Sequence, residues 1–112
     1  MIPWPIESIP NEDSLFMRVH RTWFTPDGSI IPRAFQNHGG GMSTDWSRFS
    51  TATETRGRKS PIDNAVVSME VGLVRAVPGQ TVEHTPLADN RAHTDVRGEK
   101  DEEARVLLRR VA

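Results

Sequence analysis

The sequence contains no cysteine among its 112 residues. This absence excludes a disulfide framework, a zinc site built from thiolates and a thiol nucleophile, and it is compatible with a reducing compartment. Any binding or reactive site must therefore be built from oxygen and nitrogen groups.

The sequence has no marked excess of positive or negative charge, and it has no long apolar run. Fourteen Lys and Arg against fifteen Asp and Glu leave a formal charge of -1, which removes the bulk electrostatic argument for a nucleic-acid or anionic-membrane partner. The first residues carry neither a basic leader nor an apolar signal-peptide block, and no segment is long enough to cross a bilayer. We therefore expect a cytoplasmic protein with no nucleic-acid or membrane partner.

Hydrophobic side chains make up 36% of the sequence, which is enough for one core. The length predicts a single domain at residues 14–112, preceded by an extended arm at residues 1–13. Three prolines among the first ten residues remove backbone donors that a helix or a sheet would need. The arm carries Ile2, Trp4, Ile6 and Ile9, which predict that it packs across the domain or against a second subunit of a homo-oligomer.

Alternation of apolar and polar side chains predicts a first strand at residues 15–24. The Thr-Pro-Asp-Gly segment at residues 25–28 then favours a turn, so we expect a hairpin with the residues that follow it. In this strand Arg18 and His20 lie on a shared face, whereas Arg21 points to the other side.

Residues 65–77 are rich in valine and predict a long central strand. The alternation shifts phase near its end, and a β-bulge at Gly72 would explain the shift. A Pro-Gly turn follows, after which residues 80–85 are expected to return antiparallel to this strand. The simplest register sets Val82 opposite Arg75 and His84 opposite Leu73.

Two segments between these strands predict loops. Three consecutive glycines at residues 39–41 indicate a mobile loop, with a phosphate cradle as the alternative, although the lysine of a Walker motif is missing. The basic residues within residues 56–61 are interrupted by glycine and followed by proline, which is typical of a solvated connector. The alternative is a docking point for phosphate or an acidic partner.

The segment between these loops favours short helical turns between residues 45 and 57. Ser43, Thr44 and Asp45 are all residue types that cap helix N-termini. The Thr-x-x-Glu pattern at residues 51–54 fits a capping box.

The C-terminal region predicts a loop at residues 86–91, a short strand at residues 92–97 and a helix that begins after Asp101. The apolar stripe of this helix consists of Ala104, Leu107, Leu108 and Val111. The resulting fold class is a small α+β domain, with a mainly antiparallel sheet, the C-terminal helix packed on one face and long polar loops.

Residues 82–96 gather two of the four histidines, three carboxylates and an arginine, more groups able to bind a ligand than any other segment. A polar site built from both ends of the chain would combine this segment with the first strand. The candidate ligand-binding residues are Arg18, His20, Ser43, Thr44, His84, Asn90, Arg91, His93 and Asp95. Imidazoles near an arginine and a carboxylate suit proton transfer or ligand binding.

A metal site and a nucleophilic serine are the two sharper hypotheses. His84, His93 and Asp95, with Glu83 or His20, would suit zinc, iron(II) or nickel. Their spacing matches no tight metal-binding motif, so we predict no metal and no cofactor. Ser43 is the best candidate for a nucleophile, because it follows the glycines, but the glycine-flanked nucleophile elbow is absent.

Several blocks of the chain resemble those of small uncharacterised bacterial proteins, a resemblance to which no activity is attached. These blocks are residues 18–21, 32–35, 42–47, 82–86 and 90–94. The order of polar residues is also similar to that of ADP-ribosyltransferases, in which an Arg or His on a first strand, a Ser-Thr pair and a later Glu surround a dinucleotide. That resemblance implies roles for Arg18 or His20, for Ser43 with Thr44, and for Glu70 or Glu83.

Two classes of function follow from these patterns. The first is a non-catalytic binding or interaction module for an unknown small molecule or protein, as an accessory or homo-oligomeric protein. The second is a small enzyme acting on a nucleotide or another phosphorylated substrate, in which Arg18 and Arg91 would hold the anion. In that enzyme His20, His84 or His93 would move protons.

Overall fold

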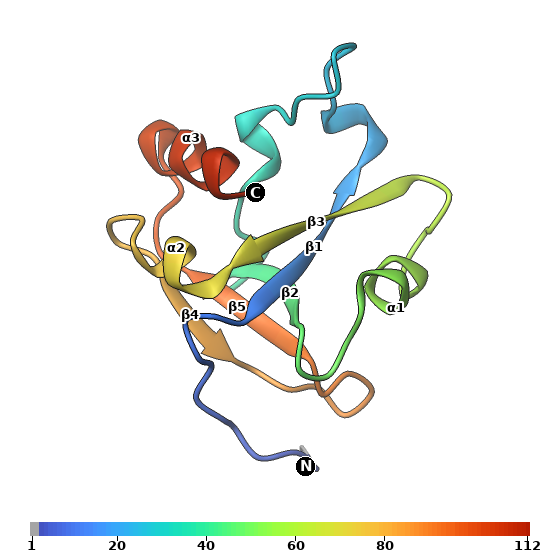
Figure 1. Cartoon of the computed structure of the whole chain (residues 1–112), viewed down its shortest axis with the longest axis vertical. Helices are drawn as coiled ribbons and strands as arrows, with labels where there is room; N and C mark the ends of the chain where they lie inside the picture. Colours follow the sequence, from blue (N-terminus) through green and yellow to red (C-terminus); the bar gives the residue numbers. More distant parts are fainter. Residues whose placement is uncertain (1–2) are drawn as a thin grey trace.

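The computed structural model describes residues 3–112 and confirms the α+β fold class, with a five-stranded antiparallel sheet in the order β3-β1-β2-β5-β4 (Figure 1). The strands are β1 (Ser14–His20), β2 (Met42–Trp46), β3 (Asn64–Glu70), β4 (Thr81–His84) and β5 (His93–Arg97). The helices are α1 (Ala52–Gly57), α2 (Val71–Arg75) and α3 (Glu102–Val111). Within residues 3–112, no helix combines the length and the apolar character that crossing a bilayer requires.

The core lies on one face of the sheet. Side chains of β1 alternate between buried and partly exposed, as the sequence pattern predicts, and Leu15 is fully buried. Phe35 and Trp46 are the largest fully buried side chains. Helix α3 lies over this face together with α2, and it begins where predicted, because the Asp101 carboxylate accepts a 2.9 Å hydrogen bond from the Ala104 N–H (Figure 1).

The first strand is shorter than predicted. It ends at His20, and a one-turn 3-10 helix (Arg21–Trp23) replaces its last residues. The cause is local: His20 Nδ1 accepts a hydrogen bond from the Thr22 N–H at 3.2 Å and caps this turn. The expected hairpin is reduced to a single bridge between Phe24 and Ile30.

The prediction that Ser43, Thr44 and Asp45 cap helical turns is wrong, because all three lie in strand β2 at the centre of the sheet. The glycine segment ends in a tight turn closed by a bridge between His38 and Gly41, which leads directly into this strand. The N-cap expected nearby is confirmed: Thr51 Oγ1 accepts a 3.1 Å hydrogen bond from the Glu54 N–H at the start of α1, which is one of the two bonds of a capping box.

The predicted strand at residues 65–77 is correct only as far as Glu70, where α2 begins. The phase shift at Gly72 marks a helix and not a bulge. The N–H of Gly72 donates to the Asn11 carbonyl at 2.9 Å, and a Cβ added to this glycine would lie 3.1 Å from the Asn11 Cβ. The close approach of the arm and the burial of Val71 and Val74 therefore stabilise a helix here, although valine by itself favours strands.

The expected pairing of residues 80–85 with the preceding strand is also wrong. Helix α2 carries the chain away from β3, and β4 pairs with β5 at the opposite edge of the sheet. The observed register places Val82 opposite Val96 and His84 opposite Thr94. The short strand predicted at residues 92–97 is present as β5.

The N-terminal arm is extended and packs on its own domain. Ile9 is buried, and Arg75 donates a 2.7 Å hydrogen bond to its carbonyl. The carboxylate of Glu7 pairs with Arg48 at 2.6 Å and with Arg91 at 3.5 Å. Ile2, which the sequence analysis counted among the apolar side chains of the arm, lies outside the described residues.

Lys100 is an unusual buried cation between β5 and α3. It is 6% exposed, and its ammonium donates to the carbonyls of Val96 at 3.0 Å and Gly98 at 2.9 Å. Burial disfavours the charged form and lowers the pKa of Lys100 from 10.5 to about 8.

The lowered pKa predicts that the free energy of unfolding rises with pH between about 8 and 10.5. In this window the unfolded chain still binds a proton that folded Lys100 has released, so raising the pH favours the folded state by up to about 3 kcal/mol. Urea unfolding across the window measures this slope. The background is small because the chain has no tyrosine, no cysteine and only one other lysine, so a slope that survives Lys100→Met would contradict the assignment.

Candidate functional site

Strands β1 and β2 pair over only a short distance. Their register contains two pairs, Leu15 with Trp46 and Phe16 with Asp45, whereas β1 forms seven pairs with β3. Continuing the register would pair Arg18 with Ser43, but the two strands separate before that point. The separation opens a cavity of about 520 Å³ within the sheet, which we call the large cavity.

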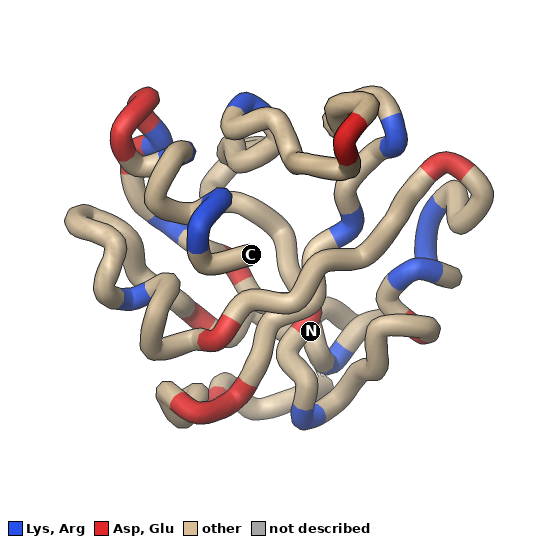
Figure 2. Tube along the Cα trace, turned by 45° about the horizontal axis from the view of Figure 1, so that its top comes forward, with Lys and Arg blue, Asp and Glu red and all other residues tan. Residues whose placement is uncertain are grey.

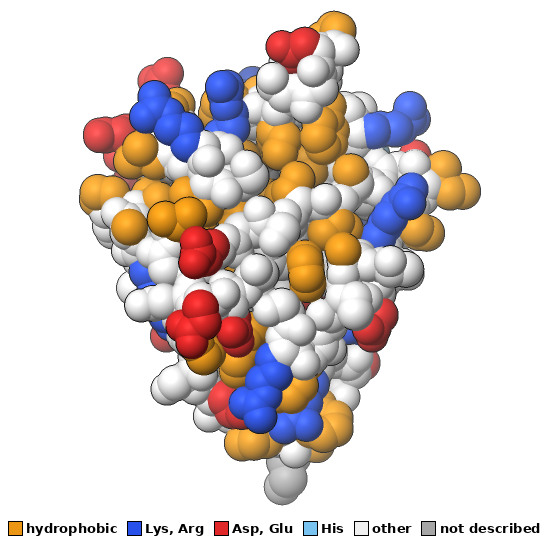
Figure 3. All heavy atoms as spheres, viewed as in Figure 1, with side chains coloured by type: hydrophobic (Ala, Val, Ile, Leu, Met, Phe, Trp, Pro, Cys, Tyr) orange, Lys and Arg blue, Asp and Glu red, His pale blue; other side chains and the backbone are white. Residues whose placement is uncertain are grey.

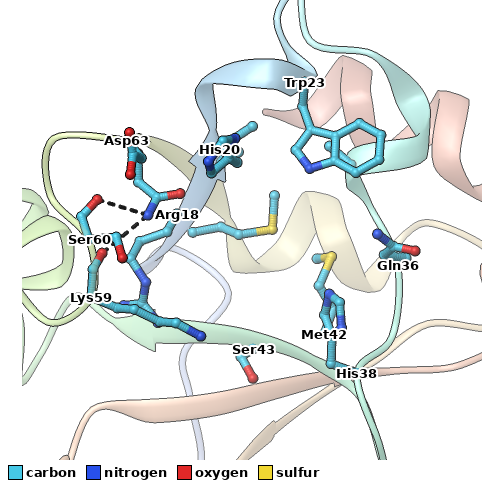
Figure 4. A pocket seen from close by; sticks show the side chains of 14 residues that line it. Arg18, His20, Trp23, Gln36, His38, Met42, Ser43, Lys59, Ser60 and Asp63 are labelled. Atoms are coloured by element: carbon cyan, nitrogen blue, oxygen red, sulfur yellow. Dashed lines mark hydrogen bonds between the residues drawn. The ribbon is translucent and has the colours of Figure 1, made fainter.

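One side of the large cavity is polar, and the other is mainly apolar but also carries Gln36 and His38 (Figure 4). The apolar lining consists of Met17, Val19, Trp23, Ala34 and Met42, and the polar lining of Arg18, His20, Gln36, His38, Ser43, Lys59, Ser60, Asp63 and Asn64. Figure 4 shows Lys59, Ser60 and Asp63 on one side, and Trp23, Met42 and His38 on the other. Its volume falls within the range of small-molecule sites, roughly 300 to 1,000 Å³.

Cationic groups dominate the polar side. Within residues 3–112, Lys59 forms no salt bridge, and Arg18 uses one nitrogen to donate to the Thr55 carbonyl at 3.0 Å. The lining carboxylate, Asp63, already pairs with Arg21 at 3.2 Å. This local excess arises in a chain whose charges of both signs are interspersed along the trace and over the surface (Figures 2 and 3).

The loop that carries Lys59 is held in an uncommon conformation. Ser60 has a φ of 45°, in the left-handed region that non-glycine residues rarely adopt. The side-chain amide of Asn64 donates to the carbonyls of Lys59 and Ser60, both at 3.1 Å. Two basic residues near this loop are engaged within the chain: Arg56, in the last turn of α1, donates to the carbonyls of Pro61 and Asn64, and Arg58 pairs with Asp45.

A small cavity of about 20 Å³ lies beside the large one and has room for about one water molecule. Its lining is Phe16, Arg18, Ser43, Thr44, Asp45, Asn90 and His93. Arg18 and Ser43 line both cavities, so the two are neighbours.

Ser43 and His93 form a hydrogen-bonded pair at this junction. The distance from Ser43 Oγ to His93 Nε2 is 3.3 Å. The other ring nitrogen, His93 Nδ1, lies 3.0 Å from the Thr85 carbonyl oxygen and 3.0 Å from Thr85 Oγ1. The imidazole is therefore held at both nitrogens, by Ser43 of the neighbouring strand β2 and by Thr85 in the loop after β4.

The buried carboxylate of Asp45 organises the wall behind this pair. One oxygen accepts from Thr55 Oγ1 at 2.8 Å and from Arg58 Nε at 3.0 Å, and the other accepts from Asn90 Nδ2 at 2.8 Å. These bonds join β2 to α1 and to the turn before β5. Asn90 thus contributes to the small cavity as a supporting residue, with its amide already engaged.

The remaining candidates lie apart from the two cavities. His84 is buried on the opposite face of the sheet, where its ring contacts Trp46 at a centroid distance of 5.1 Å. Its Nδ1 accepts from the Glu7 N–H at 3.0 Å, and its Nε2 donates to the Arg91 carbonyl at 2.7 Å. Both ring nitrogens are thus occupied in tying the arm to the domain.

Arg91, Asp95 and Thr44 also have internal partners. The Arg91 guanidinium stacks 4.1 Å from the ring centroid of Phe49, and Asp95 Oδ2 lies 3.7 Å from Arg97. Thr44 Oγ1 donates to the Thr94 carbonyl at 2.9 Å. The cavities therefore bring together Arg18, His20, Ser43, Thr44, Asn90 and His93, and leave out His84, Arg91 and Asp95.

The structure adds residues that the sequence analysis did not select, chiefly Trp23, His38 and Lys59. Lys59 belongs to the basic segment for which an anion-binding role was one alternative. His38 and Trp23 carry no signal in the sequence, because they reach the cavity only through the separation of β1 and β2.

No family model, curated protein or solved structure gives a significant match to the chain. The geometry bears on the residues that the resemblance to ADP-ribosyltransferases implies: Arg18, His20 and Ser43 share the large cavity, whereas Glu70 and Glu83 are absent from its lining. Within residues 3–112, no three His, Asp or Glu side chains are grouped to hold a metal ion.

Proposed function

We propose that the protein is a binding module for a small organic anion that carries an aromatic or apolar group. The site is the large cavity between β1 and β2. The single observation that carries this proposal is the early separation of two neighbouring strands, which leaves a sizeable cavity inside an otherwise continuous sheet.

The apolar side of the cavity suits an aromatic or aliphatic group. Met17 and Met42 are 4% and 2% exposed, and thioethers adapt their shape to different ligands. Trp23 is half-buried beside them and offers an indole face for stacking.

The polar side suits a carboxylate or a phosphate. Lys59 supplies a cation that pairs with no carboxylate of residues 3–112, and Arg18 retains donors that its bond to Thr55 does not use. A cytoplasmic location belongs to this proposal and is supported by the absence of cysteine. The arm packs on its own domain through Ile9 and Glu7, so the proposal does not require a second copy of the chain to cover the arm.

The test compares 1-naphthyl phosphate with 1-naphthol, which differ only in the anionic group. We expect the phosphate ester to raise the melting temperature by mass action and to bind more tightly than the alcohol. In NMR spectra the indole N–H signal of Trp23 should shift, whereas that of Trp46, whose Nε1 donates to Asp13 at 2.9 Å, should stay. The three tryptophans thus provide an internal control.

Replacing Lys59 with methionine should weaken binding of 1-naphthyl phosphate by about tenfold, because a charge-assisted contact is lost. Binding of 1-naphthol should be unchanged. The matched control is Arg109→Met, which removes a cation from the exposed last turn of α3. Equal binding of both probes, or an equal response of Trp23 and Trp46, would contradict the proposal.

A further inference from the structure

We propose that Ser43 is a nucleophile activated by His93, and that the two cavities together support hydrolysis of small carboxylic esters. This inference rests on the proposed function for its substrate, because the ester would occupy the large cavity. The reactive pair is defined independently, by the contacts of Ser43 and His93 themselves.

The tautomer of His93 is fixed by its surroundings. His93 Nδ1 lies 3.0 Å from both the carbonyl oxygen and the hydroxyl of Thr85, and because the carbonyl can only accept, this pair of contacts favours the tautomer in which Nδ1 carries the proton and donates. In the neutral ring the lone pair then belongs to Nε2, which lies 3.3 Å from Ser43 Oγ. Ser43 donates to this nitrogen, which is the arrangement in which an imidazole accepts the proton of a nucleophilic hydroxyl.

A carbonyl oxygen thus takes the place that a carboxylate holds in a Ser-His-Asp triad. It orients the ring without adding a full negative charge beside it. The carboxylates that strands β2, β4 and β5 place on the same face are engaged elsewhere: Asp45 with Arg58, and Asp95 and Glu83 with Arg97. Within residues 3–112, no carboxylate pairs with His93, and its Nε2 faces Ser43 Oγ.

Ser43 lies between the two cavities, so the ester and the water molecule can reach it from different sides. The ester lies in the large cavity, where Lys59 and Arg18 favour negative charge on the attacked carbonyl oxygen. Figure 4 shows the Lys59 side chain extending toward Ser43. The small cavity, lined by both Ser43 and His93, has room for about one water molecule, which is the second reactant of a hydrolysis.

The reaction balances with water as the co-reactant. Ser43 Oγ attacks the carbonyl carbon and passes its proton to His93 Nε2, and the alcohol leaves with that proton as the ester C–O bond breaks. Water then attacks the acyl group on Ser43 and gives a proton to His93. The carboxylic acid is released as His93 returns the proton to Ser43 Oγ.

Diisopropyl fluorophosphate tests the pair on the full chain without requiring that the large cavity be occupied. Ser43 Oγ would form a bond to phosphorus, the P–F bond would break, and the Ser43 proton would pass to His93. Ser68 is a matched internal reference, because it is an exposed serine on the same face of the sheet, opposite Phe16 in the register. We expect mass spectrometry to find Ser43 modified about 100-fold or more faster than Ser68.

Two variants extend the test. His93→Gln should abolish the preference for Ser43, and its melting curve shows whether it folds. Ser43→Ala should remove the adduct and the hydrolysis of p-nitrophenyl acetate by the protein. Modification of Ser43 and Ser68 at equal rates in the unaltered chain would overturn the proposal without any variant, as would rapid modification of Ser43 in folded His93→Gln.

The outcomes separate this inference from the proposed function. If 1-naphthyl phosphate binds but Ser43 is not selectively modified, the nucleophile is refuted and the binding site stands. If Ser43 is modified but 1-naphthyl phosphate does not bind, the nucleophile stands and the proposed ligand class is wrong. If both hold, 1-naphthyl phosphate should slow modification of Ser43 and leave Ser68 unaffected.

Discussion

Replacing Trp46 with alanine is expected to lower the free energy of unfolding by about 3 to 5 kcal/mol. Trp46 is fully buried, and its ring makes edge contacts with Phe49 and His84 at centroid distances of 5.2 and 5.1 Å. Its indole N–H also donates to Asp13, so the variant leaves both a cavity and an unpaired acceptor. Urea unfolding followed by circular dichroism measures the loss.

The matched control for this large loss is Trp4→Ala. Trp4 is 37% exposed and lies on the arm, where Arg91 stacks 5.0 Å from its ring centroid. Its removal should cost roughly 1 kcal/mol or less. Equal losses for the two variants would mean that Trp46 is not the centre of the core.

Replacing Asp45 with alanine should cost about 3 kcal/mol, because it leaves the buried donors of Thr55, Arg58 and Asn90 without their acceptor. Unfolding by urea gives the stability change. The same variant should reduce the selective modification of Ser43, since Asp45 fixes the wall of the small cavity that Ser43 and His93 share.

Asp63→Ala serves as the control for Asp45, because it removes a carboxylate from an exposed ion pair. The side chains of Arg21 and Asp63 are 73% and 45% exposed, so this pair contributes roughly 1 kcal/mol or less. If Asp45→Ala lowers the free energy of unfolding no more than Asp63→Ala does, burial does not strengthen the hydrogen bonds of Asp45.

The parts of the fold that the sequence predicted correctly depend on local signals. Asp101 and Thr51 cap helices where a capping residue precedes a helical pattern. The alternation in β1 identifies its buried face, because a strand with one face on the core must repeat every two residues. These signals lie within a few residues of the structure they specify.

The parts predicted wrongly depend on contacts between distant residues. Strand β2 contains Ser43, Thr44 and Asp45, whose polar side chains hide its place at the centre of the sheet. Its pairing with β5 joins segments about fifty residues apart, as for Ser43 and Asp95, and no local pattern encodes that pairing. Helix α2 arises in the same way, since the arm at Asn11 determines where β3 stops.

The sequence predicted which types of side chain the candidate site contains, but not which of the candidate residues line it. Arg18 and His20 were placed on one face by the strand period, and this placement brings both to the large cavity. His84 has the same chemistry, yet one residue of register sends it to the opposite face, where Trp46 packs against it. The sequence alone does not show that His20 lines the cavity and His84 does not, because that difference depends on the pairing of β4 with β5.

The short contact between β1 and β2 also has a mechanical consequence. The sheet consists of two ribbons, β3-β1 and β2-β5-β4, which are joined directly at two residue pairs and by hydrogen bonds between Ser14 and Ser47. They are also linked through α1, where Thr55 bonds both Arg18 and Asp45. Fewer ladder hydrogen bonds fix the angle between the ribbons at this joint than between strands paired along their whole length. A molecule that contacts both Arg18 and Ser43 would bridge the two ribbons and add a further connection between them.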